Sequence, residues 1–194
     1  MFNCSMRKLT IAALSLGCLS VPAFCAQGEA PVAVSSAAVA PAQAPAPEKP
    51  AYVKKDTYFS LNGYDGVNVD LASYAGKPVL VMFFTSYCPY CKFAAPVMQH
   101  ISETYGPKGL AVLGISTENA PEKARDFAQK YKLSFPIVVG GKPVSVAYKA
   151  HGVPNFYLLD SSHDVAGKWL GYDDGDEKTF SAAIEKVLSP AKKS

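Results

Sequence analysis

The chain has 194 residues, of which 49% are hydrophobic and 18% are charged, a composition that suits one well-buried globular domain and not two. Its 19 basic and 16 acidic residues leave a formal net charge of +3, far from the concentrated positive field that nucleic-acid binding requires. We therefore expect one folded domain, with no nucleic acid among its partners.

Residues 1–26 have the pattern of a signal peptide. Two basic residues, Arg7 and Lys8, precede an apolar run over 9–19, and a stretch of small residues follows. The run is shorter than the roughly 20 residues that cross a bilayer, which favours a cleaved signal over a permanent membrane helix. We expect an exported protein, with the bacterial periplasm as its compartment. Membrane or lipid anchoring is the alternative, and the cleavage position stays open.

Residues 27–51 are dominated by Ala, Pro, Ser and Val and carry few charges. Such a stretch cannot bury a core and is typical of a disordered linker. The folded domain is therefore expected over residues 52–194.

The domain begins with an apolar alternation over 58–61 and turn signals at 62–63 and 65–66, which predict a hairpin-like start. The continuous apolar run over 79–84 has the β-branched and aromatic character of a strand that is buried on both faces. We expect this run to be the central strand of a sheet.

A helix is predicted over 89–105, because Pro89 suits a first turn and Val97, Ile101 and Tyr105 repeat at intervals of four residues. A buried strand over 110–115 and a helix over 120–132 follow. Together these elements make a strand-helix-strand-helix pattern, which predicts parallel pairing.

The last part of the chain predicts a strand, a short helix, two strands joined by a turn, and a final helix. Their expected ranges are 137–139, 144–150, 155–160, 165–170 and 176–188. The sum is an α/β fold in which a central mixed sheet is flanked by helices on both faces.

Three of the five cysteines lie in the leader, and only Cys88 and Cys91 lie in the domain. A disulfide between them would close so short a loop that it would add little stability, so the pair is expected to serve chemistry. Cys88 falls where a strand ends and a helix begins, where free N–H groups and the helix dipole stabilise a thiolate. We expect Cys88 to be the exposed attacking thiol and the more buried Cys91 to resolve the mixed disulfide.

Two close cysteines can also be half of a zinc site, which needs two further ligands. No second paired motif exists in the sequence, and His100, His151 and His163 are separated single residues that we expect on the surface. We expect no metal, and no cofactor beyond a reversible disulfide between the two cysteines.

From residue 58 to residue 188 the chain resembles the TlpA-like and redoxin branch of the thioredoxin superfamily. The resemblance is carried by Gly-Lys-Pro and the apolar run over 76–84, by Cys-Pro-Tyr-Cys over 88–91, and by Gly-Val-Pro at 152–154 with the apolar run after it. The resemblance implies a thioredoxin-like fold and an enzyme that is a thiol–disulfide oxidoreductase.

The resemblance also implies that Pro154 follows a cis peptide bond and faces the redox pair, while the backbone of Val153 pairs with substrate. Tyr87, Pro89 and Tyr90 would line the same substrate-binding site. The implied partners are exported protein thiols or disulfides, and a redox-recycling partner for which a membrane protein is one candidate.

Two acids that handle protons in related proteins are absent from this chain. The buried acid of thioredoxins corresponds to Met82, and the glutamate that many cytochrome-maturation members carry after the pair corresponds to Ala94. Glu118, just beyond the strand over 110–115, would transfer protons if it approaches the pair, and is otherwise a solvated loop acid.

Two other functions stay open alongside disulfide exchange in either direction. Thr85 lies three residues before Cys88, as a threonine does in peroxidatic sites, which gives a peroxiredoxin-like peroxidase as an alternative. Val81 stands where those sites have a proline. The second alternative is a thioredoxin-like binding or chaperone module, against which the intact cysteine pair and Pro154 argue.

Overall fold

The computed structural model describes residues 54–189. The predicted signal peptide over 1–26 and the predicted linker over 27–51 lie outside the described residues, as do both ends of the expected domain. Within residues 54–189, no helix has the length and apolar character needed to cross a membrane.

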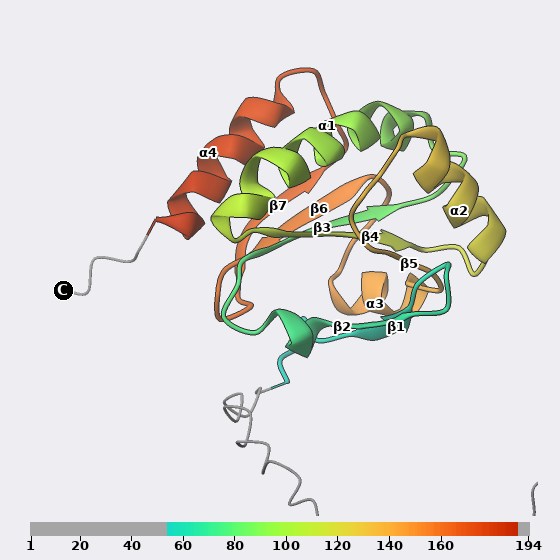
Figure 1. The fold of residues 1–194 in the computed structure, drawn as a ribbon, viewed down its shortest axis with the longest axis horizontal. Helices are drawn as coiled ribbons and strands as arrows, with labels where there is room; N and C mark the ends of the chain where they lie inside the picture. The colour runs from blue at the N-terminus through green and yellow to red at the C-terminus, as the bar shows by residue number, and fades with distance from the viewer. Residues whose placement is uncertain (1–53, 190–194) are drawn as a thin grey trace, which may run out of the picture. The chain divides into compact units, whose positions relative to one another are not determined.

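The predicted elements are present in the predicted order, and Figure 1 shows their arrangement. In chain order they are β1 (Ser60–Asn62), β2 (Asn68–Asp70), the 3-10 helix η1 (Leu71–Tyr74), β3 (Val79–Phe84), α1 (Pro89–Tyr105), the 3-10 helix η2 (Gly106–Lys108), β4 (Ala111–Ser116), α2 (Pro121–Lys130), β5 (Ile137–Val138), α3 (Lys142–Ala147), β6 (Asn155–Leu159), β7 (Val165–Leu170) and α4 (Asp176–Leu188).

Five strands form one mixed sheet in the order β5-β4-β3-β6-β7, and β1 and β2 form the predicted antiparallel hairpin. β3 runs parallel to β4 and antiparallel to β6, so Val81 lies opposite Leu113 on one side and Tyr157 on the other. The prediction of a central strand over 79–84 is confirmed. Because β6 is antiparallel to β3, β6 begins at the end of the sheet where β3 stops.

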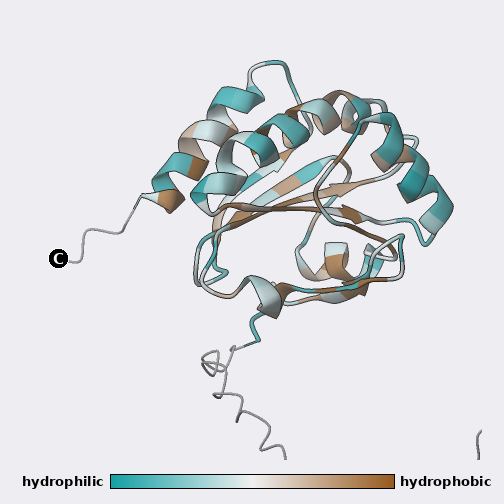
Figure 2. Ribbon diagram, viewed as in Figure 1, coloured by the Kyte–Doolittle hydropathy of each residue, from teal (hydrophilic) through white to brown (hydrophobic). Residues whose placement is uncertain are grey.

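Both faces of β3 are covered, and each of its six side chains is at most 2% exposed. Leu80, Met82 and Phe84 face a core shared with α1, α2 and α4, whereas the alternate residues face a core shared with the hairpin and α3. Figure 2 shows these hydrophobic strands inside, with the most hydrophilic residues on the surrounding helices and turns. Full burial of one large apolar side chain stabilises the folded state by about 1.5–3 kcal/mol. The six buried side chains of β3 therefore contribute much of the stability of the fold.

α1 and α4 begin and end at the predicted residues, but α3 does not. The helix expected over 144–150 is Lys142–Ala147, because Pro143 occupies its first turn and the chain leaves the helix after Ala147. In α1 the residue that faces inward near the middle of the helix is Met98, wholly buried, whereas Val97 is only partly buried.

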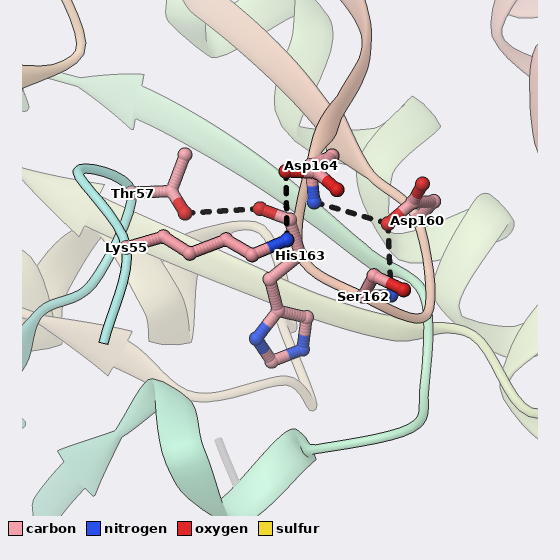
Figure 3. A network of polar contacts seen from close by, with 6 residues as sticks. All are labelled: Lys55, Thr57, Asp160, Ser162, His163 and Asp164. Atoms are coloured by element: carbon pink, nitrogen blue, oxygen red, sulfur yellow. Dashed lines mark hydrogen bonds and ion pairs between the residues drawn. The ribbon is translucent and has the colours of Figure 1, made fainter. Parts of the chain in front are cut away.

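The turn between β6 and β7 binds the start of the described chain (Figure 3). The Thr57 hydroxyl donates to the carbonyl oxygen of His163 at 2.9 Å, and the Lys55 ammonium lies 2.7 Å from the Asp164 carboxylate. The Asp160 carboxylate accepts the backbone N–H of Asp164 at 3.0 Å and so orders the turn. We call the two contacts made by Lys55 and Thr57 the N-terminal clamp.

His163 is 0% exposed, so the expectation that it lies on the surface is wrong. It occupies a left-handed position of the turn, with φ 61°, and its ring Nε2 lies 3.2 Å from the Tyr74 carbonyl oxygen. Burial lowers the pKa of His163, although hydrogen bonds to the backbone of Tyr74 and Lys77 partly oppose that effect. His100 and His151 are exposed, as predicted.

Candidate redox site

The cysteine pair lies where β3 leads into α1. Cys88 is the N-cap of α1, with an extended backbone, and Cys91 lies in the first turn of the helix. Pro89 occupies the first helical position, where the missing N–H of proline leaves no hydrogen bond unmade. Both thiols are free, so the structure represents the reduced pair.

The sulfur of Cys88 has one contact to the helix and one to the loop before β6. It accepts the backbone N–H of Cys91 at 3.3 Å, and its thiol donates to the carbonyl oxygen of Val153 at 3.5 Å. The first contact is an N-cap hydrogen bond, which places the sulfur at the positive end of the helix dipole. The second contact places the sulfur against a backbone carbonyl oxygen of the loop before β6.

The two sulfurs differ in their access to solvent. Cys88 is 7% exposed and Cys91 is 0% exposed. The prediction that Cys91 is the more buried residue is confirmed, but the expected exposure of Cys88 is too high, because Val153 packs against it.

Burial raises the pKa of Cys91 far above its ordinary value. A hydrogen bond to the sulfur of Cys88 raises the pKa further, and a hydrogen bond from the backbone of Thr85 opposes both. Cys91 is consequently a thiol at neutral pH, whose proton must leave before its sulfur can act as a nucleophile.

The peptide bond between Val153 and Pro154 is cis, which confirms that prediction from the family resemblance. Pro154 is buried, and its carbonyl oxygen accepts the backbone N–H of Gly171 at 2.9 Å, immediately after β7. The loop beside Cys88 is therefore held to the sheet on the side away from the sulfur.

Exposed aromatic side chains lie on both sides of Cys88 in the sequence. Tyr87 and Tyr90, both predicted from the sequence, are 69% and 58% exposed, and Pro89 between them is also exposed. Phe93 is also exposed, at 66%, and the sequence analysis did not include it among the candidate site residues. Phe93 lies three residues after Tyr90 and so on the same face of the helix, and this spacing could have identified it.

Glu118 is not a solvated loop acid, so that expectation is wrong. Its side chain is 15% exposed, and its Oε2 accepts the backbone N–H of Ser86 at 2.6 Å. Burial raises the pKa of Glu118, but the Ser86 hydrogen bond and the charge of Lys123 outweigh burial, and the net shift is downward. Glu118 is thus an ionised group bound to the loop that carries Cys88, and proton transfer by it stays a prediction.

The positions that carry acids in related proteins are apolar and buried here. Met82 is 2% exposed and Ala94 is 0% exposed, in the same core as both cysteines. Two other buried atoms near this end of the sheet, Thr85 Oγ1 and Asn155 Oδ1, have no hydrogen-bond partner among the described residues. No sequence pattern indicated that Asn155 would be buried at this end of the sheet.

Metal ligands do not gather at this site. Across residues 54–189, no group of three or more His, Cys, Asp or Glu side chains is placed to hold a metal ion.

Comparison with known proteins places this site in a family. Residues 54–170 match the model described as the AhpC/TSA family. Thioredoxin-like protein YneN of Bacillus subtilis is 33% identical over 105 residues, which are 53% of this chain and 61% of YneN, so the match spans less than two thirds of that relative. Thiol-disulfide oxidoreductase ResA of Bacillus cereus is 24% identical over 125 residues, which are 64% of this chain and 72% of that protein.

Solved structures share the fold. A thiol:disulfide interchange protein of the thioredoxin family from Chlorobium tepidum TLS superposes with a TM-score of 0.61 at 23% identity, over 68% of this chain and 93% of that chain. A secreted disulfide oxidoreductase of Mycobacterium tuberculosis gives 0.61 at 19% identity, over 70% of this chain and 100% of that chain. The fold is thioredoxin-like, and because the family model matches from the first described residue to the end of β7, the chain belongs to the AhpC/TSA family.

Proposed function

We propose that the protein is an exported thiol–disulfide oxidoreductase that exchanges disulfides with protein substrates through Cys88 and Cys91. The observation that carries the proposal is the placement of the Cys88 sulfur, 3.3 Å from the Cys91 backbone N and 3.5 Å from the Val153 carbonyl oxygen. The helix N-terminus favours the thiolate, and the backbone of Val153 offers an extended substrate a short β-bridge beside it.

In the reducing direction, the Cys88 thiolate attacks one sulfur of a substrate disulfide. A bond forms between Cys88 and that sulfur, the substrate disulfide breaks, and the second substrate sulfur leaves as a thiolate and takes up a proton. Cys91 then loses its proton and attacks the Cys88 sulfur, which forms the Cys88–Cys91 disulfide and releases the first substrate sulfur. Two electrons and two protons have passed to the substrate, and the reverse sequence oxidises a substrate dithiol.

The raised pKa of Cys91 gives the two thiols separate roles. Cys91 stays protonated while Cys88 reacts, so the mixed disulfide forms before the resolving step begins. The reversible disulfide is the redox centre, and the reaction scheme requires no further cofactor.

Substrate would lie across Tyr87, Pro89 and Tyr90 and pair with the backbone of Val153, next to Pro154. The substrates are exported proteins with thiols or disulfides, the compartment is the bacterial periplasm, and a second redox protein, for which a membrane protein is a candidate, recharges the pair. Two relatives bear names that support this class of activity, thiol-disulfide oxidoreductase and thioredoxin-like protein.

The proposal is tested by trapping. Reduced Cys91→Ser protein, mixed with a disulfide-bonded peptide, should accumulate a mixed disulfide on Cys88, detected by intact-mass spectrometry, while Cys88→Ser protein should form none. Adducts found on Cys91 and not on Cys88 would reverse the two roles. The equilibrium potential then gives the direction, since a value near about −120 mV marks an oxidant and one below about −250 mV a reductant.

A peroxidase is the second candidate, and the observation that favours it is the buried hydroxyl of Thr85, three residues before Cys88 and without a hydrogen-bond partner among residues 54–189. Such a hydroxyl can donate to a bound peroxide oxygen. Peroxide consumption by the reduced protein, at a rate that Thr85→Val lowers, would support this function. Reduced protein that neither consumes peroxide nor exchanges disulfides would point to a binding module.

A further inference from the structure

A depression of about 230 Å³ lies between the start of α1, next to the redox pair, and α2. Its lining consists of one serine, three lysines, one aspartate and two aromatic residues: Ser86, Lys92, Lys123, Asp126, Phe127, Lys130 and Tyr131. We call this depression the lysine pocket.

The charges of the lysine pocket are not balanced within the protein. Three ammonium groups line it against one carboxylate. Lys123 lies 3.4 Å from the Glu118 carboxylate, but Lys92 and Lys130 form no ion pair with any residue that the structure describes. The pocket therefore has two lysines available to an anionic group.

Two aromatic side chains, Phe127 and Tyr131, form the floor of the pocket. The Phe127 ring is 5% exposed and stacks on Phe84 of β3 with ring centroids 4.7 Å apart, and Tyr131 packs against Phe127 at 4.9 Å. The Lys130 ammonium lies 5.7 Å from the centre of the Tyr131 ring. An apolar floor strengthens the attraction between the rim and an anion, and it accepts the methylene groups of a side chain.

The position of the pocket relates it to the substrate. Ser86 on its rim is two residues before Cys88, and α2 follows β4, whereas Val153 precedes β6 on the other side of β3. A substrate bonded to Cys88 would therefore have Val153 on one side and the lysine pocket on the other. Because Ser86 is only two residues from Cys88 and an extended chain advances about 3.3–3.6 Å per residue, a residue a few positions from the substrate cysteine is the one placed to reach the pocket.

We propose that the lysine pocket binds an acidic side chain of the substrate polypeptide, a few residues from its reacting cysteine. This proposal rests on the disulfide exchange proposed above and names a feature of its substrates. The carboxylate would lie between Lys92 and Lys130, with its methylene groups on Phe127 and Tyr131.

A larger depression, of about 780 Å³, also contains three lysines, but it lies at the other end of the sheet and has no part in this proposal. Its lining includes Pro78, before β3, and Asp160, after β6, and both are distant from Cys88 along the strands. Lys186 on its rim provides a control, because a change there removes the same charge far from the redox pair.

The test compares three cyclic disulfide peptides that are identical except for Glu, Gln or Lys three residues from the cysteine. The rate of their reduction by the full chain should be highest for Glu, with about a two- to fivefold preference over Gln at low salt, because ion pairs at a partly exposed site contribute little free energy. Lys should react slowest, and salt should weaken the Glu preference. The Lys92→Gln, Lys130→Gln double variant should lose the preference, whereas Lys186→Gln should keep it.

Reduction of bis(2-hydroxyethyl) disulfide, which is small and uncharged, separates the two proposals. Every variant should reduce it at the rate of the unaltered protein, since it does not reach the pocket. If the reduced unaltered protein failed to react with this compound and the oxidised protein also failed to react with its thiol form, 2-mercaptoethanol, the proposed exchange itself would be overturned. Normal reduction with no preference for the Glu peptide, or a preference that survives in the double variant, would overturn the role of the lysine pocket.

Discussion

Glu118 holds the loop that carries Cys88, through a hydrogen bond of 2.6 Å from the Ser86 N–H. Removing the acceptor leaves that N–H without a partner, at a cost of about 1–3 kcal/mol. Glu118→Ala should therefore destabilise the protein by this amount in urea unfolding at pH 7, and Glu118→Gln, which keeps an acceptor, by less. Glu122→Gln, an exposed change on the same side of the sheet, should cost about 0.5 kcal/mol.

The same carboxylate makes stability depend on pH. The pKa of Glu118 is lower in the folded protein than in the unfolded chain, so its contribution is present above the unfolded value and is lost as pH falls through the folded value. The difference in stability between the unaltered protein and Glu118→Gln should narrow on acidification. A difference that stayed constant down to pH 3 would contradict this account.

Met82 lies in the core under the cysteine pair, where a carboxyl would have no partner. Met82→Asp should lower the free energy of unfolding by about 3–5 kcal/mol at pH 7, through loss of packing and burial of a polar group. Acid should relieve part of the cost, because burial raises the pKa of such a carboxyl and folding then favours its neutral form. Met82→Leu is the control and should cost less than about 1.5 kcal/mol.

At the residue scale, a local sequence pattern was enough to single out the two cysteines as a candidate redox pair. Contacts between residues that are distant in the sequence could not be predicted. The roles proposed for Cys88 and Cys91 rest on their spacing at a strand-helix junction, which the sequence displays directly. The contact between Glu118 and Ser86 joins residues 32 positions apart and depends on where β3 and β4 end relative to each other. No pattern in the sequence encodes that alignment, and the same holds for the burial of Asn155.

At the scale of elements, long helices with clear ends were predictable and the short helix was not. α1 begins at a proline after an N-cap residue and ends before Gly106-Pro107, so its limits are marked at both ends. α3 has six residues and no N-cap side chain, and its position is set by contact with the sheet.

Gly141, just before α3, lies where the chain packs closely against β4. A Cβ at this position would overlap the side chain of Ile115 and lie 3.1 Å from the Ser116 carbonyl oxygen, both on β4. Gly141→Ala should therefore cost about 1–3 kcal/mol in urea unfolding, by forcing α3 away from β4. Gly106→Ala is the matched change, because Gly106 has helical backbone and nothing lies within 4 Å of its Cβ position. It should leave stability unchanged or raise it by about 0.4–1 kcal/mol.

At the scale of the whole molecule, the mixed sheet was predictable, because a parallel strand-helix pattern is followed by a hairpin of strands. The N-terminal clamp was not, since it joins Thr57 to His163 across 106 positions. The stability of this region depends on His163, whose pKa is lower in the folded protein than in the unfolded chain.

Because the unfolded chain binds the proton of His163 more tightly, stability should fall as pH drops below about 6.5, with a slope of up to about 1.4 kcal/mol per pH unit. His163→Asn, which does not titrate and tolerates the left-handed backbone, should reduce that slope between pH 7 and pH 5. The quantity to compare is the slope of the unfolding free energy against pH, and not the free energy itself, because the His163→Asn change also removes packing contacts.

The N-terminal clamp also decides where a mechanical load would enter the domain. The turn that it holds lies at the far end of β6 from Pro154, about 16 Å along a strand of five residues. Tension on the chain before Lys54 would act first on the contacts of this segment, which include the Lys55–Asp164 and Thr57–His163 pairs and the hydrogen bond that the Tyr148 hydroxyl donates to the Thr57 carbonyl oxygen. A load applied at this end would therefore enter the domain at the opposite end of β6 from Pro154, and so at the opposite end of the sheet from Cys88.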